Sequence, residues 1–180
     1  MGIRTSTPSC SIRVLCFSIP DIKFLARAYH PATIKRMKVR PLQKKDISRA
    51  VAVILENHER EYAAQARQEL EETFKMSAAI RPHYVVAEDR GCVAGIAGYM
   101  QSWMDYDIWL IFWVNVEPAR QRQGIGKLLV RRAIADIKKQ KGAKLILLSA
   151  ASPKDYAAHF GFKAVKVFGK NRQRLMALAL

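Results

Sequence analysis

The feature that most constrains the fold of this chain is a strand–helix–strand pattern between residues 108 and 148. Residues 108–116 are almost wholly apolar, and their uninterrupted run of seven apolar residues is far shorter than the ~20 that a membrane helix needs. The apolar residues of 125–140 follow the spacing of one helix face, and 144–148 is again apolar. Two buried strands joined by a helix lie parallel in one sheet, so this unit predicts an α/β fold.

The rest of the chain adds strands and three more helices to this unit. An apolar stripe predicts a helix that begins at an Asp46 cap, and good helix formers favour a second helix over 61–74. A short helix is expected between Ser152 and Gly161. The resulting order β-α-α-β-β-β-α-β-α-β-β predicts a mixed sheet, whose other strands are expected at 38–42, 83–88, 92–103, 162–168 and 174–180.

One domain, residues 37–180, accounts for this pattern, and residues 1–36 form an N-terminal extension. The extension is rich in Ser and Arg and shows no sustained period, whereas Met37 opens the first well-patterned segment. We expect a non-core arm or an upstream start. Three cysteines without a repeated spacing fit neither a disulfide framework nor a zinc site. We therefore expect a cytoplasmic protein without a metal or a membrane span.

The positive charge of the chain is concentrated in its C-terminal third. The formal net charge is +16, and residues 118–180 hold 15 Lys and Arg against two Asp. A basic field of this kind attracts polyanions such as nucleic acid, an anionic membrane or a phosphorylated cofactor. Charge alone leaves the choice among these partners open.

The turn before the helix holds two glycines in the sequence Gln-Arg-Gln-Gly-Ile-Gly at 121–126. Glycines let the backbone approach a ligand closely, and the first turn of a helix offers free N–H groups to a phosphate. The sequence of this turn does not match two common nucleotide-binding motifs. A Walker A loop needs Gly at Gln121 and Ser or Thr at Leu128, and a dinucleotide fingerprint needs a small residue at Leu129. ATP or NAD chemistry through this loop is therefore disfavoured.

The loop resembles the [Gln/Arg]-x-x-Gly-x-[Gly/Ala] motif of the GNAT superfamily of acyl-CoA-dependent N-acetyltransferases. The Val-x-Val-x-Pro sequence at 114–118 and the Phe-Gly-Phe at 160–162 are also similar to family features. The resemblance covers about 37–180 and implies a GNAT-like fold in which acetyl-CoA lies where two central parallel strands splay apart. It implies acetyl transfer from acetyl-CoA to a primary amine by direct attack in a ternary complex, without a metal. The cofactor-binding residues that it implies are Val114, Asn115, Val116, Gln121, Arg122, Gln123, Gly124, Ile125, Gly126 and Lys127.

The catalytic residues follow the family pattern less closely. The reaction needs a base for the ammonium and benefits from an acid for the departing thiolate. Many relatives carry a Glu on the central strand where this chain has Phe112, and a Tyr near the penultimate helix end where it has Ala157. We take Tyr156, one position earlier, as the candidate acid. The candidate base is Asp107, with Asp105, Glu61 or a water chain as alternatives.

Two other function classes remain open. The departures at Phe112 and Ala157 motivate a catalytically weak or inactive acyl-CoA-binding protein of the same fold. The charge motivates a basic nucleic-acid-binding module, which ranks last because the aromatic-interleaved motif of an RNA-recognition domain is missing.

The partners follow from the resemblance. Residues 56–72 hold six Glu against two Arg, and the family places the first two helices beside the acceptor. An acidic rim suits a cationic amine on a small molecule or a protein. A homodimer is a further expectation, and a membrane partner is not expected.

Overall fold

The computed structural model describes residues 36–77, 81–168 and 173–180. The proposed N-terminal extension lies outside these residues except for Arg36. Within the described ranges no helix is long and apolar enough to cross a membrane. The elements are β1 (Lys38–Pro41), η1 (Lys44–Asp46), α2 (Ile47–Leu55), α3 (Arg60–Thr73), β2 (His83–Asp89), β3 (Cys92–Gln101), β4 (Ile108–Val116), η2 (Pro118–Arg120), α4 (Ile125–Lys138), β5 (Leu145–Ala150), α5 (Pro153–Phe160), β6 (Lys163–Phe168) and β7 (Gln173–Ala179).

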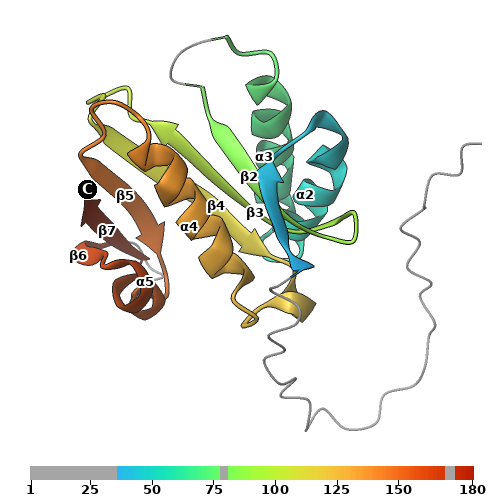
Figure 1. Ribbon diagram of the computed structural model, residues 1–180. Coiled ribbons are helices and arrows are strands. Elements are labelled where there is room, and N and C mark those ends of the chain that lie inside the picture. Colours follow the sequence, from blue (N-terminus) through green and yellow to red (C-terminus); the bar gives the residue numbers. More distant parts are fainter. Residues whose placement is uncertain (1–35, 78–80, 169–172) are drawn as a thin grey trace, which may run out of the picture.

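The strands of the described residues form one seven-stranded mixed sheet in the order β1-β2-β3-β4-β5-β7-β6 (Figure 1). β4 and β5 are parallel, and the other neighbouring pairs are antiparallel. The predicted α/β fold and its element order are confirmed, with α4 as the crossover between the two parallel strands. Element ends differ from the predicted ends by a few residues, as frayed termini commonly do.

Helices cover both faces of the sheet and create two hydrophobic cores. α4 crosses one face (Figure 1), where Leu129 and Ile137 pack on the central strands. α2 and α3 cover the other face, where Ile54 and Leu70 are fully buried. The central strands are therefore covered on both sides, which explains why 108–116 reads as a continuous apolar run rather than an alternating one.

The two parallel strands separate partway along β4. Their ladder runs from Ile108 paired with Leu145 to Ile111 paired with Leu148, and it does not continue among the described residues. Beyond this point β5 stays beside β7, while β4 stays beside β3 as far as Val116. The edge of β4 that faces β5 therefore offers backbone groups outside the sheet ladder.

A β-bulge lies in β4 just after this separation. The register between β3 and β4 shifts between Ile96 and Gly98, so Trp113 and Val114 together lie opposite one residue of β3. Trp113 has a φ of 50°, which a bulky residue rarely adopts. Because the extra residue interrupts the alternation, Phe112 and Trp113 both face the α2–α3 core, and Val114 faces the α4 core.

Asp46 is the N-cap residue of α2, as predicted, but its side chain makes no capping hydrogen bond to the helix. Asp46 ends η1, and its carboxylate accepts a hydrogen bond from the backbone N–H of Gln43 at 2.8 Å. Arg40 of β1 donates to both oxygens of Asp46 and also to Glu88 of β2. Burial alone would raise the pKa of Asp46, but the hydrogen bonds from Arg40 and Gln43 hold this pKa below its ordinary value. This acid therefore ties the start of α2 to the sheet.

Asp46→Asn is expected to destabilise the fold by about 1–3 kcal/mol at neutral pH, because Arg40 loses a charged hydrogen-bond partner. A carboxyl whose pKa is lowered in the folded state stabilises that state only while it is ionised. The difference from wild type should therefore be complete above about pH 5 and shrink as the pH falls below about 4. Urea unfolding over a pH series measures this difference, with Glu61→Gln on the exposed start of α3 as the control. A difference that stays constant down to about pH 3 would contradict the assignment.

Candidate active site

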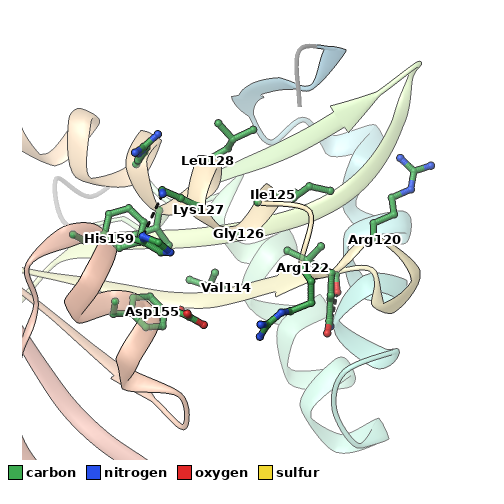
Figure 2. Close-up of a pocket in the computed structure, with 16 residues that line it drawn as sticks. Val114, Arg120, Arg122, Ile125, Gly126, Lys127, Leu128, Asp155 and His159 are labelled. Carbon is green, nitrogen blue, oxygen red and sulfur yellow. Dashed lines mark hydrogen bonds between the residues drawn. The ribbon is translucent and has the colours of Figure 1, made fainter. Parts of the chain in front are cut away.

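A cavity of about 630 Å³ opens where the chain leaves β4 and enters α4 (Figure 2). Its walls come from the end of β4, the loop with the first turns of α4, and one side of α5. This cavity, called the loop cavity below, lies beside the part of β4 that is no longer paired with β5. It can therefore receive a ligand that contacts both the loop and the strand edge.

Unusual backbone angles shape the loop before α4. Arg122 and Gly124 have φ values of 60° and 84°, a region that favours glycine. Gly124 is the N-cap of α4 and offers no side-chain cap, and the N–H of Leu128 donates to its carbonyl at 3.1 Å. The N–H groups of residues 125–127 therefore lie at the open N-terminus of a helix, a position that binds anions.

Gln121 attaches this loop to the end of β4. Its side-chain amide donates to the carbonyl of Val116 at 3.1 Å and to the side-chain oxygen of Asn57 at 2.7 Å. Asn57 follows α2, and its side-chain amide donates to the same Val116 carbonyl at 3.0 Å. Because its amide N–H groups are used in these contacts, Gln121 positions the loop.

Cationic side chains outnumber carboxylates in the walls of the loop cavity. Arg122, Lys127 and Arg131 line it and have no carboxylate ion-pair partner within the described part of the chain. Lys127 points toward His159 of α5, with 3.2 Å between Nζ and Nδ1 (Figure 2). Asp155 is the one carboxylate among the lining residues. The balance of charge favours an anionic ligand.

Tyr156 lies in the same cavity and packs against Phe160 and Phe162. Burial, and next the negative charge of Asp155, raises the pKa of Tyr156 above its ordinary value. A phenol with a raised pKa remains protonated at neutral pH. Tyr156 can therefore act as a proton donor in this cavity.

The structure brings together most of the predicted cofactor-binding residues but leaves out Asn115 and Gln123. Asn115 is buried on the opposite face of β4, where its side-chain oxygen lies 2.9 Å from His58 Nε2, because neighbouring strand residues face opposite sides. The Gln123 amide turns back to the carbonyl of Ala119. The predicted residues that line the cavity are Val114, Val116, Gln121, Arg122, Gly124, Ile125, Gly126 and Lys127.

Most of the lining residues from the second turn of α4 and the side of α5 were not predicted from the sequence. Arg131 lies four positions after Lys127, so helix periodicity alone could have placed it on the same face. Leu128, which is half-buried, and Val130, which is buried, also line the cavity. The other missed lining residues are Arg120, Asp155, His159 and Phe160.

The three acidic candidates for a base lie away from the loop cavity. Asp107 is near the start of β4, at the opposite end from Val114, and pairs there with Lys144. Asp105 accepts a hydrogen bond from the backbone N–H of Asp107, and Glu61 is exposed in the first turn of α3. The structure therefore does not bring Asp107 to Tyr156, because the turn acids stay at the other end of the sheet.

The family assignment follows from a match to a family model. Residues 51–162, more than half of the chain, match the model of the acetyltransferase (GNAT) family. The chain therefore belongs to this family, as the glycine loop predicted. A comparison with curated proteins gives no match.

Solved structures support the same fold. A protein described as a GNAT-family acetyltransferase from Desulfovibrio desulfuricans has a TM-score of 0.69 and 20% identity, over 79% of this chain and 98% of that chain. The PaiA N-acetyltransferase of Thermoplasma acidophilum, in complex with coenzyme A, has a TM-score of 0.65 and 16% identity over 80% and 99%. A GNAT-family acetyltransferase from Brucella melitensis, in complex with acetyl-CoA, has a TM-score of 0.57 and 26% identity over 84% and 89%.

Gly124→Ala is expected to destabilise the fold by about 1–2 kcal/mol, because alanine disfavours the left-handed angle at this position. Gly126→Ala is the matched control, since its added Cβ would meet Val116 at an ordinary 3.7 Å. Urea unfolding of both variants measures the two effects. Equal free energies of unfolding would show that the loop does not depend on the Gly124 conformation.

Proposed function

We propose that this chain transfers an acetyl group from acetyl-CoA to a primary amine by direct attack in a ternary complex. The observation that carries this proposal is the loop cavity, at the uncapped N-terminus of α4 and beside the unpaired edge of β4. Coenzyme A is complementary to it, because it joins a phosphate-rich nucleotide to an amide-bearing arm. The coenzyme A and acetyl-CoA complexes of the Thermoplasma and Brucella proteins support the same ligand.

Different parts of the cavity suit different parts of this cosubstrate. The N–H groups of residues 125–127 suit the pyrophosphate, and Lys127 with Arg131 suits phosphate charge further along α4. The edge of β4 at Val114 suits the amides of the pantetheine arm, as an added strand would, whereas the Val116 carbonyl already accepts from Gln121 and Asn57.

The reaction makes three demands on the protein. The amine loses a proton before its nitrogen attacks the thioester carbonyl carbon, and the resulting oxyanion requires a hydrogen-bond donor. The sulfur receives a proton as the C–S bond breaks. In this proposal a backbone N–H beside the bulge at Val114 stabilises the oxyanion, and Tyr156 protonates the sulfur.

Acetyl-CoA is expected to raise the melting temperature of the purified chain by several degrees, whereas ATP is not. A ligand at 100 times its Kd adds about 2.7 kcal/mol of stability. Replacing both Lys127 and Arg131 by Ala should reduce the shift, while Lys141→Ala, beyond the end of α4, should leave it intact. A chain that millimolar acetyl-CoA does not stabilise would contradict the proposal.

Tyr156→Phe is expected to lower kcat by about 10–100-fold without weakening acetyl-CoA binding, because Phe keeps the ring packing but cannot donate a proton. Release of the coenzyme A thiol in the presence of an amine measures the rate. An unchanged kcat would remove Tyr156 from the mechanism. If the wild-type chain binds acetyl-CoA but acetylates no amine, the inactive acyl-CoA-binding alternative holds.

A further inference from the structure

A second cavity, of about 820 Å³, lies on the other face of the sheet beside α3. Apolar side chains of the strands, among them Leu110, Leu147 and Leu175, form much of its wall. Glu69 and Glu72 of α3 line it as well. This cavity, called the α3 cavity below, combines an apolar wall with negative charge.

Two aromatic rings form part of the wall of the α3 cavity. Tyr84 and Phe112 meet edge to face, with 5.7 Å between their ring centroids. A Cβ at Gly98 would lie 2.6 Å from Phe112 and 2.9 Å from Tyr84, so glycine at this position allows both rings to pack against β3. Phe112 therefore contributes apolar surface and no titratable group.

The bulge of β4 holds the carboxylate of Glu69 at this cavity. The indole N–H of Trp113 donates to Glu69 Oε2 at 2.7 Å, and the Gln65 amide donates to Glu69 Oε1 at 2.8 Å. Trp113 reaches Glu69 because the bulge turns its side chain toward the α3 side of the sheet. A carboxylate oxygen accepts two hydrogen bonds, so both oxygens can still accept one from a ligand.

The hydroxyl of Tyr84 is a buried polar group beside the α3 cavity. Tyr84 is 5% exposed and lines the α3 cavity, and its hydroxyl has no hydrogen-bond partner in the described ranges. Burial, and next the charge of Glu69, raises the pKa of Tyr84, so the hydroxyl stays protonated. Buried polar groups are normally hydrogen-bonded. The Tyr84 hydroxyl is therefore an unpaired polar group behind the cavity wall, while the carboxylate of Glu69 lines the cavity itself.

The two cavities flank the bulge from opposite faces of the sheet. Val114 lines the loop cavity, and its neighbours Trp113 and Phe112 line the α3 cavity. Beyond Ile111 and Leu148 the ladder between β4 and β5 has ended. A ligand in the α3 cavity thus lies next to the part of the sheet through which an acyl group could reach it.

We propose that the α3 cavity binds the acceptor as a primary ammonium carried on an apolar, ring-bearing chain, and that Glu69 binds this ammonium and accepts its proton. The proposal rests on the acetyl transfer proposed above and adds the acceptor class and the base. The apolar wall receives the body of the acceptor. An acceptor that carries its own carboxylate would meet Glu69 and Glu72 and is disfavoured.

The proton balance of this reaction is complete. The ammonium passes one proton through Glu69 to solvent, and the neutral nitrogen then attacks the thioester carbon. The C–N bond forms and the C–S bond breaks. The second proton lost by the nitrogen replaces the one that Tyr156 gives to the sulfur. The products are the acetylated amine and coenzyme A as its thiol.

Steady-state kinetics of the full chain with two amines test the proposal. The probes are 2-phenylethylamine and 2,2-difluoro-2-phenylethylamine, whose fluorines lower the basicity of the nitrogen and change the shape little. Glu69→Gln keeps an acceptor for the Trp113 indole and removes the base. Glu71→Gln is the matched control, because this exposed residue of the same helix pairs with Arg67 and does not line the cavity.

The expected result is that wild type acetylates 2-phenylethylamine and that Glu69→Gln lowers its kcat/KM about 100-fold. The loss should be clearly smaller for the less basic amine, and Glu71→Gln should match wild type with both. Acetyl-CoA should raise the melting temperatures of wild type and Glu69→Gln equally.

Three results would overturn the assignment of acceptor and base while the transfer reaction stands. The first is equal activity of the Glu69→Gln and Glu71→Gln variants, and the second is an equal loss with both amines. The third is a wild-type chain that acetyl-CoA stabilises but that does not acetylate 2-phenylethylamine. If acetyl-CoA fails to stabilise the wild-type chain, the transfer reaction itself is overturned.

Discussion

The end of hydrogen bonding between β4 and β5 after Ile111 and Leu148 is the constraint on which both cavities depend. If β4 and β5 were paired along their whole length, the continuous sheet would separate the two cavities completely. Outer neighbours hold the strands apart: β5 pairs with β7, and β4 pairs with β3 across a bulge. Unpaired backbone groups inside a protein cost free energy, so the free edge of β4 suits a ligand with amides of its own.

Local periodicity was enough to predict the order of the elements but not the local deviations from them. The strand–helix–strand unit was visible because its helix is amphipathic, whereas its two strands are largely apolar on both faces. The bulge at Trp113 was not visible, because β4 has no polar residues before Asn115 whose alternation would reveal a shift. Asp46 was correctly predicted as the N-cap residue of α2, but its bond to Arg40 of β1 was not visible in the local pattern.

The candidate site likewise has features that could be predicted from the sequence and features that could not. The loop was predictable because the angle at Gly124 and the helix that follows are encoded by adjacent residues. The orientation of α5 was not, because it depends on the packing of Tyr156 against Phe160 and Phe162. Glu69 is separated from Trp113 by more than forty positions, and their hydrogen bond exists only because the bulge redirects the indole.

The two cavities lie on opposite faces of one sheet, and this placement affects how ligands bind and leave. If coenzyme A binds the loop cavity and the acceptor binds the α3 cavity, as proposed, coenzyme A can be exchanged while the acceptor stays bound. The same separation allows the residues of the two cavities to change independently during evolution. Under the proposed assignment, substitutions in the α3 cavity would change the acceptor that is modified without changing the residues that bind acetyl-CoA beside α4.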